Sequence, residues 1–351
     1  MPPPARPQRL GPYDVVAKIA GGGMATIYLG RGRDATGAEI VAAIKVIRHD
    51  LSRNDEVVRM FLDEAKTLSR LSHPNITRTL EYGVSADQHF IAMELLLGRT
   101  LADVWDTCRE RKLALRMDMS AYIAARVADA LSYAHELEGE DGQRLNLIHR
   151  DVNPSNIFLT YDGQIKLFDF GLAKALGRRA KSGEGIVKGK LPYLAPEAVM
   201  QFPIDSRADI FTLGATLWEM TTMRRLFKRD SDVETVKAVR TSPIPDPKRS
   251  VPSYPDELAR VVKRALERNR DHRYQSASEL ATDLDAFVAT CGKNDMPQMI
   301  DGILDTLFVG ERDRQMGWLR TTTALSPDSR RGTIAPPVPI SARGAPPPSR
   351  K

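Results

Sequence analysis

Two short polar motifs with apolar neighbours constrain this sequence more than any other feature. The first is His149-Arg150-Asp151-Val152-Asn153-Pro154-Ser155-Asn156, and the second is Asp169-Phe170-Gly171. Between them lie two short β-forming segments, residues 157–159 and 165–168, joined by the turn residues Asp162-Gly163. One carboxylate can orient a hydroxyl nucleophile, while the second carboxylate and the amide can hold a divalent metal ion against a nucleotide's phosphates. The motifs therefore indicate a phosphoryl-transfer site, and the alternative is two ordinary polar turns in an α/β protein.

Length and cysteine content are compatible with such a site. The chain has 351 residues with 42% hydrophobic content, enough to bury a substantial core. Its two cysteines, Cys108 and Cys291, lie far apart in unrelated contexts, so we expect reduced thiols and neither a disulfide framework nor a zinc site. No apolar stretch approaches membrane-spanning length, and the N-terminus lacks the apolar core of a signal peptide. We therefore expect a soluble, cytoplasmic protein without a membrane partner.

The net charge of +6 is concentrated in the C-terminal tail. Residues 326–351 hold five bases against Asp328, which gives +4 and leaves +2 for the rest of the chain. The folded part is thus nearly balanced, which argues against a nucleic-acid partner. The tail is also rich in proline, so we expect it to be disordered, and we expect the same of the proline-rich residues 1–12.

The first half of the chain carries a second group of phosphate-binding features. The cluster Gly21-Gly22-Gly23 lies between two segments of β character, residues 15–19 and 27–29, and predicts a hairpin whose tip can approach phosphate. Lys45 lies in the apolar strand predicted over residues 40–47 and needs an anionic partner, unless it reaches water from an edge strand. Apolar residues recur at helical spacing from Val57 to Leu71, and Glu64 lies on this predicted helix, either as that partner or on a solvated face.

In series, these motifs resemble the eukaryotic-type (Hanks-type) serine/threonine protein kinases, and in particular soluble bacterial members, from about Tyr13 to Thr290. The resemblance implies an α+β, bilobal fold. A small β-rich N-lobe with one long helix is expected over residues 13–95, and a larger, mainly helical C-lobe over residues 96–290. Beyond the region of resemblance, we expect residues 291–325 to form a tail with a short helix around Ile300 to Phe308, which either docks on the lobe or reaches a partner. The tail of residues 326–351, expected to be disordered, follows.

The resemblance also implies how ATP is bound. Lys45 holds the α- and β-phosphates and pairs with Glu64. The Glu94 carbonyl and the Leu96 N–H bind adenine, and Met93 closes the pocket behind it. The remaining ATP-binding residues that the resemblance implies are Ile19, Ala20, Gly22, Ile27 and Ala43. In the glycine-rich pattern only Gly22 is kept in register, because Ala20 and Ala25 occupy the outer glycine positions.

For the reaction itself, the resemblance assigns Asp151 as the catalytic base and Asn156 and Asp169 as Mg²⁺ ligands. His149 is expected to pack and hydrogen-bond rather than transfer protons. Arg150 marks the class in which an ordered or phosphorylated activation loop neutralises this arginine, and Ser182 is the loop's candidate phosphorylation site, although the loop could also need no phosphate. Two structural roles are implied as well: Glu197 pairs with Arg273, and Asp209 holds the backbone of the catalytic loop.

Two positions depart from the family together. The lysine that usually follows the catalytic aspartate by two residues is Asn153 here, and Lys190 replaces the threonine that usually contacts that lysine. We hypothesise that Lys190 supplies the missing catalytic charge; the alternative is one more base in a basic loop. The sequence thus favours a kinase for protein serine or threonine, acting also on itself. A nucleotide-binding pseudokinase scaffold is the alternative, and the proline-rich tail could bind a partner protein in either case.

Overall fold

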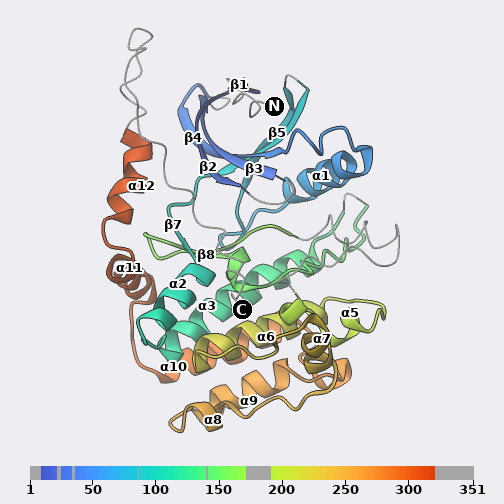
Figure 1. Cartoon of the computed structure of the whole chain (residues 1–351), viewed down its shortest axis with the longest axis vertical. Coiled ribbons are helices and arrows are strands. Elements are labelled where there is room, and N and C mark those ends of the chain that lie inside the picture. The colour runs from blue at the N-terminus through green and yellow to red at the C-terminus, as the bar shows by residue number, and fades with distance from the viewer. Residues whose placement is uncertain are drawn as a thin grey trace, which may run out of the picture. The chain divides into compact units, whose positions relative to one another are not determined.

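The computed structural model describes residues 9–21, 25–33, 36–85, 87–139, 141–170 and 191–320. The chain divides into two compact units (Figure 1). The N-terminal unit comprises Met1–Ser72, Arg78–Leu96 and Asp313–Lys351, and the C-terminal unit comprises His73–Thr77 and Leu97–Arg312. Each unit has the secondary structure expected from the sequence, because the first is built on a β-sheet with one long helix and the second is mainly helical.

A six-stranded antiparallel sheet forms the N-terminal unit. Its strands are β1 Arg9–Leu10, β2 Tyr13–Gly21, β3 Ala25–Arg33, β4 Glu39–Ile47, β5 Thr79–Ser85 and β6 Gln88–Glu94, in the spatial order β1-β2-β3-β4-β6-β5. Because side chains alternate along a strand, the sheet has two apolar faces. One face packs Ala42, Ile44 and Val46 of β4 into a core with residues of β1, β2 and β6. On the other face, Ile47 and Ile91 pack against the helix.

The helix α1 (Asp55–Leu68) begins and ends with defined caps. The Asn54 side chain accepts hydrogen bonds from the backbone N–H groups of Glu56 and Val57, so Asn54 is an effective N-cap. The sequence predicted a helix to Leu71, and this end was wrong. The Leu71 N–H donates to the carbonyl of Leu68, because the chain leaves the helix in a tighter turn three residues earlier.

The C-terminal unit combines a small sheet with most of the helices. Its strands β7 Gly98–Thr100, β8 Ile157–Thr160 and β9 Ile165–Leu167 are antiparallel and adjacent in this order. The helices are α2 Leu101–Glu110, α3 Met117–Glu136, α5 Pro196–Val199, α6 Arg207–Thr222, α7 Asp232–Thr241, α8 Pro247–Ser250, α9 Asp256–Ala265, α10 Ala277–Thr290 and α11 Met296–Leu307, and α12 (Glu311–Arg320) begins here. Helix α6 is buried on all sides, as its apolar sequence predicted. None of the helices described here combines the length and the hydrophobicity needed to cross a bilayer.

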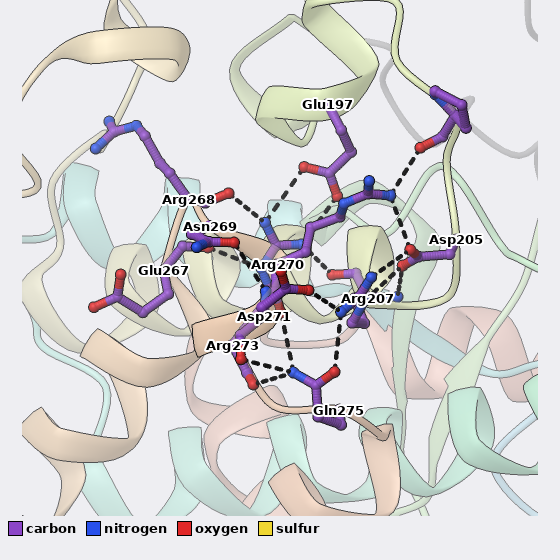
Figure 2. A network of polar contacts seen from close by, with 11 residues as sticks. Glu197, Asp205, Arg207, Glu267, Arg268, Asn269, Arg270, Asp271, Arg273 and Gln275 are labelled. Atoms are coloured by element: carbon purple, nitrogen blue, oxygen red, sulfur yellow. Dashed lines mark hydrogen bonds and ion pairs between the residues drawn. The ribbon is translucent and has the colours of Figure 1, made fainter.

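A buried ion pair connects α5 to the segment before α10 (Figure 2). Glu197 Oε1 lies 3.0 Å from Arg273 Nη1, and the two side chains are 3% and 0% exposed, so the predicted pair is confirmed. Arg273 also donates to the carbonyl of Arg207. The Arg207 guanidinium in turn donates to Asp271 and Gln275, which extends the network toward the surface. Because a buried charge is costly without partners, each member of this network depends on the others.

Candidate active site

Lys45 lies in the interior of the N-terminal sheet. Its register partners are Ile27 of β3 and Ile91 of β6, so β4 has neighbours on both sides and the edge-strand alternative was wrong. The Lys45 Nζ is 2.8 Å from Glu64 Oε1 on α1, and the side chains are only 15% and 8% exposed. This is the ion pair predicted from the sequence. An ammonium that is mostly buried and oriented by a carboxylate can form a strong, charge-assisted hydrogen bond to a phosphate oxygen.

Strand register brings several predicted ATP-binding residues to the same face of this sheet. Ala20 is opposite Ile27, which is itself opposite Lys45. Ala43 is opposite Met93, and it lies two residues from Lys45 along β4. Residues directly opposite each other, and residues two apart in one strand, point to the same side. This is the side that α1 covers, because Ile91 and Met93 pack against that helix.

The other predicted ATP-binding residues lie outside the regular part of the sheet or at its irregular positions. Ile19 lies where the β2–β3 register shifts, and it is 7% exposed. Strand β6 ends at Glu94, whose backbone N–H donates to the carbonyl of Arg78 and whose carboxylate accepts from the Arg78 N–H. Leu96 follows in the irregular segment before β7. Gly22 lies outside the described residues.

In the C-terminal unit, one carboxylate fixes the backbone of residues 149–156, the segment called the catalytic loop here. Asp209, at the start of α6, accepts hydrogen bonds of 2.8 Å from the N–H groups of His149 and Arg150. His135 Nε2 lies 2.8 Å from the same carboxylate. Arg150 has a φ of 63°, in the left-handed region, so two bonds to Asp209 hold a backbone conformation that most residues avoid. The role that the resemblance assigned to Asp209 is therefore confirmed.

These bonds also control the charge of Asp209. Burial alone raises the pKa of this carboxyl group, but its interactions with His135, His149 and the N–H of Arg150 outweigh burial. The pKa of Asp209 thus lies below its ordinary value. The loop is held by an ionised carboxylate, which is a stronger acceptor than a neutral acid.

His149 links the catalytic loop to the Asp-Phe-Gly segment. Its Nδ1 accepts from the N–H of Asp151 at 3.2 Å, so the proton is on Nε2, which donates to the carbonyl of Phe168 at 3.2 Å. The imidazole is buried and packs against the ring of Phe170 with 4.4 Å between centroids. Burial lowers the pKa of His149, in agreement with this neutral tautomer. The structural role predicted for His149 is confirmed.

Two amides hold the Asp151 carboxylate from opposite sides. The Nδ2 of Asn153 is 3.2 Å from Asp151 Oδ1, and the Nδ2 of Asn156 is 3.0 Å from Asp151 Oδ2. Each amide also donates to the carbonyl of Asp151 at 2.8 Å. Asp151 is 7% exposed. A carboxylate restrained in this way keeps one orientation, as a base that must meet a hydroxyl proton requires.

The donor set of this loop suits Mg²⁺. Both amide hydrogens of Asn156 are directed to Asp151, so the amide oxygen is the atom that Asn156 can offer to a cation. The N–H of Phe168 donates to the carbonyl of Asn156 at 3.1 Å, and Asp169 is the residue that follows Phe168. Asp169 has a φ of 55°, a strained conformation typical of functional sites. Carboxylate and amide oxygens are ligands that Mg²⁺ prefers.

Asn153 has a role that the sequence analysis did not assign. Its Oδ1 accepts from the N–H of Ser155 at 2.9 Å, which caps the short 3-10 helix Pro154–Asn156, while its amide nitrogen supports Asp151. The sequence Asn-Pro-Ser is a turn signal that could have indicated this bond, because asparagine often bonds to a backbone group two residues later. Lys190 and Ser182 lie outside the described residues.

Comparison with known proteins gives the family. Residues 13–284 match the protein kinase domain. Over 321 residues, the chain is 35% identical to the tyrosine-protein kinase MasK of Myxococcus xanthus (strain DK1622), covering 91% of this chain and 49% of that protein. It is 31% identical over 278 residues to the serine/threonine-protein kinase PrkC of Bacillus subtilis (strain 168), with 78% and 40% covered. The solved kinase domain of Mycobacterium tuberculosis PknI is similar with a TM-score of 0.59 and 27% identity, over 80% of this chain and 99% of that chain.

The chain belongs to the protein kinase family, since the family match covers most of its length. Several bacterial serine/threonine kinases are among its relatives, which confirms the resemblance to the Hanks type and the bilobal kinase fold. The chain spans about half or less of the length of the curated relatives described here.

Proposed function

We propose that this chain transfers the γ-phosphoryl group of ATP to serine or threonine hydroxyls of proteins, including its own. The observation that carries the proposal is the Asp151 carboxylate, restrained by two amides on a loop whose backbone is bonded to Asp209. Phosphoryl transfer requires little covalent chemistry from a protein, so catalysis depends on such positioning and on charge. Asp151 accepts the proton of the attacking hydroxyl.

Each unit contributes its own groups to this reaction. The N-terminal unit supplies Lys45, which Glu64 orients toward the α- and β-phosphates, and the Glu94 carbonyl and Leu96 N–H for adenine. Asn156 and Asp169 of the C-terminal unit hold the metal ion. When bound, Mg²⁺ neutralises charge that develops on the phosphates. Lys45, Glu64, Asp151 and Asp169 are all retained, which favours an active enzyme over the pseudokinase alternative.

The choice of acceptor hydroxyl concerns a position where the sequence departs from the pattern, because Asn153 replaces the lysine that usually marks the serine/threonine class. The serine/threonine-protein kinases PrkC of Bacillus subtilis and PknB of Mycolicibacterium smegmatis, at 31% and 33% identity, support serine or threonine. MasK, at 35% identity, is named a tyrosine kinase. The two acceptors give distinguishable products, so one experiment can separate them.

The test is to incubate the full chain with γ-labelled ATP, Mg²⁺ and a general protein substrate, beside an Asp151→Asn variant. We expect label on phosphoserine or phosphothreonine after acid hydrolysis, and at least about a hundredfold less with the variant, because a positioned base contributes that much. Label on phosphotyrosine alone would contradict serine or threonine as the acceptor. Equal absence of label from both chains, with ATP still bound, would favour the pseudokinase.

A further inference from the structure

The residues that follow the matched kinase domain pack tightly against the C-terminal unit. Helix α11 (Met296–Leu307) buries one apolar face, consisting of Met296, Ile300, Leu304 and Leu307. It contacts α2, α3 and β8, and its position beside α2 is visible in Figure 1. A helix that buries four large apolar side chains on a unit is part of that unit's core rather than a linker.

The start of α11 meets the turn between β8 and β9. Gly163 in this turn has a φ of 76°, and a Cβ there would lie 2.4 Å from both Cα and O of Pro297. Only glycine satisfies both the backbone conformation and the close approach. The turn that follows β8 is therefore shaped to receive the extension.

The end of α11 and the residues that follow it are bonded to strand β7 and to the end of helix α2. Arg111 donates to the carbonyls of Thr306 and Leu307 at 3.1 and 2.8 Å. Arg99 of β7 forms an ion pair of 2.5 Å with Glu311, and both side chains are nearly buried, at 12% and 14% exposure. The Arg99 guanidinium also lies over the ring of Phe308, 4.9 Å from its centroid. A pair with so little exposure is much less screened by water and salt than one at the surface.

Arg312, the next residue, contacts the residue that follows β8, the strand adjacent to β7. It donates to the carbonyl of Tyr161, just after β8, at 3.1 Å and lies over the Tyr161 ring. Asp305, at 3.1 Å, and Asp301 are its ion-pair partners on α11. Adjacent residues of the extension thus hold β7 and the end of β8, which begins directly after the metal ligand Asn156.

We propose that Glu311 is a positioning residue for nucleotide binding. Through Arg99, Glu311 fixes strand β7. This strand starts two residues after Leu96, the backbone donor expected to bind adenine. Within the sheet, Arg99 of β7 is opposite Leu159 of β8. This inference rests on the proposed function, because it concerns the same ATP. The extension lies outside the matched domain, so Glu311 is not part of the family's motif set.

The experiment measures ATP·Mg²⁺ affinity by calorimetry, and kinetics in parallel, for the full chain and for Glu311→Gln. We expect affinity to weaken, and the KM for ATP to rise, by about five- to tenfold with kcat nearly unchanged, the range by which residues outside a site modulate it. If the ion pair were purely structural, its removal would lower the melting temperature but would not raise the KM for ATP at a nearly unchanged kcat. The control Glu279→Gln removes the more exposed pair between α9 and α10, 2.9 Å from Arg264, and should leave ATP affinity unchanged.

A charge exchange provides the second readout. Arg99→Glu combined with Glu311→Arg should recover most of the affinity that either single change loses. Parent affinity in Glu311→Gln, or no recovery in the exchanged variant, would overturn the inference. If the parent chain binds ATP but transfers no phosphoryl group, the proposed function fails while the affinity ratios still decide this inference. A parent chain that does not bind ATP overturns both.

Discussion

Asn153 donates one hydrogen bond to the Asp151 carboxylate and another to the Asp151 carbonyl, at 3.2 and 2.8 Å. In the family that this chain resembles, the same position usually carries a lysine. The asparagine is 3% exposed and also caps the short helix after it, so it organises the loop from within. The replacement exchanges a charge for an amide that supports Asp151, the proposed catalytic base.

Asn153→Ala should therefore lower both activity and stability. We expect kcat to fall about ten- to a hundredfold, because small errors in the position of a reacting group have effects of this size. The free energy of unfolding should decrease by about 1–3 kcal/mol, since buried polar groups lose their partners. Steady-state kinetics and urea denaturation measure the two effects. Asn153→Asp keeps an acceptor for the Ser155 N–H but places a like charge beside Asp151, so an Asp variant as active as the parent would contradict the role of the amide.

Lys190 is expected to supply the charge that Asn153 lacks. Lys190→Ala should then lower kcat about a hundredfold, the usual effect of losing a group that stabilises transition-state charge. Asn153→Lys in the same chain should restore much of this loss, because it returns a cation to the family's usual position. Turnover of Lys190→Ala equal to the parent, or no rescue by the second change, would show that Lys190 is simply one more base in a basic segment.

Glu64→Gln should weaken the hold of Lys45 on the phosphates. The pair is 2.8 Å apart and mostly buried, so the neutral amide removes the negative charge that Glu64 places beside the ammonium. We expect kcat/KM for ATP to fall at least about tenfold, because charge-assisted hydrogen bonds contribute roughly 1.5–3 kcal/mol. Lys45→Met should cause a larger fall. Phosphoryl transfer assays at several ATP concentrations measure both, and a Glu64→Gln chain with parent kinetics would mean that Lys45 needs no carboxylate to orient it.

Stability should decline as pH falls below neutrality, and His149 is one cause. Its folded pKa lies below the ordinary 6.5, so below about pH 6.5 the unfolded chain binds a proton that the folded chain does not. The free energy of unfolding should drop by up to about 1.4 kcal/mol per pH unit from this group until its folded pKa is reached. Burial also lowers the pKa of His73, with the same sign. Urea denaturation of parent and His149→Gln between about pH 7.5 and 5.5 isolates the His149 part, and equal slopes would argue against it.

Arg273→Met should destabilise the chain strongly, because it leaves the Glu197 carboxylate buried without its partner. We expect a loss of about 3–5 kcal/mol in the free energy of unfolding. The double variant Glu197→Gln with Arg273→Met removes both charges and should lose less than Arg273→Met alone. Chemical denaturation of the three chains tests this coupling. A double variant that loses as much as Arg273→Met or more would contradict the coupling of the two charges.

The sequence predicted those features in which a few local residues determine the outcome. Lys45 within an apolar strand required a buried partner, and the helix that follows offered Glu64. The resemblance to the kinase family implied the anchoring by Asp209, because the motif around Asp151 identifies the loop that this aspartate holds. Hydrophobic spacing was less informative about the end of α1, since Leu71 is buried whether or not it is helical.

Other features depend on contacts between distant segments. The extension was expected either to dock on the lobe or to reach a partner, and amphipathic spacing alone cannot separate these outcomes. Docking depends on Gly163 fitting Pro297 and on Arg99 meeting Glu311, two pairs whose members are far apart in the sequence. The bond from Asn153 to Asp151 was also not predicted, because the expectation at this position concerned a missing lysine rather than the amide that replaces it.

Asp209 accepts two main-chain hydrogen bonds from the catalytic loop and sits at the start of a helix that is surrounded by the core. The path of the loop is consequently set when the unit folds. Under the proposed function, reactants that arrive later meet a carboxylate that is already oriented, so none of their binding free energy is consumed in ordering it. Control over catalysis would then act on other parts of the chain.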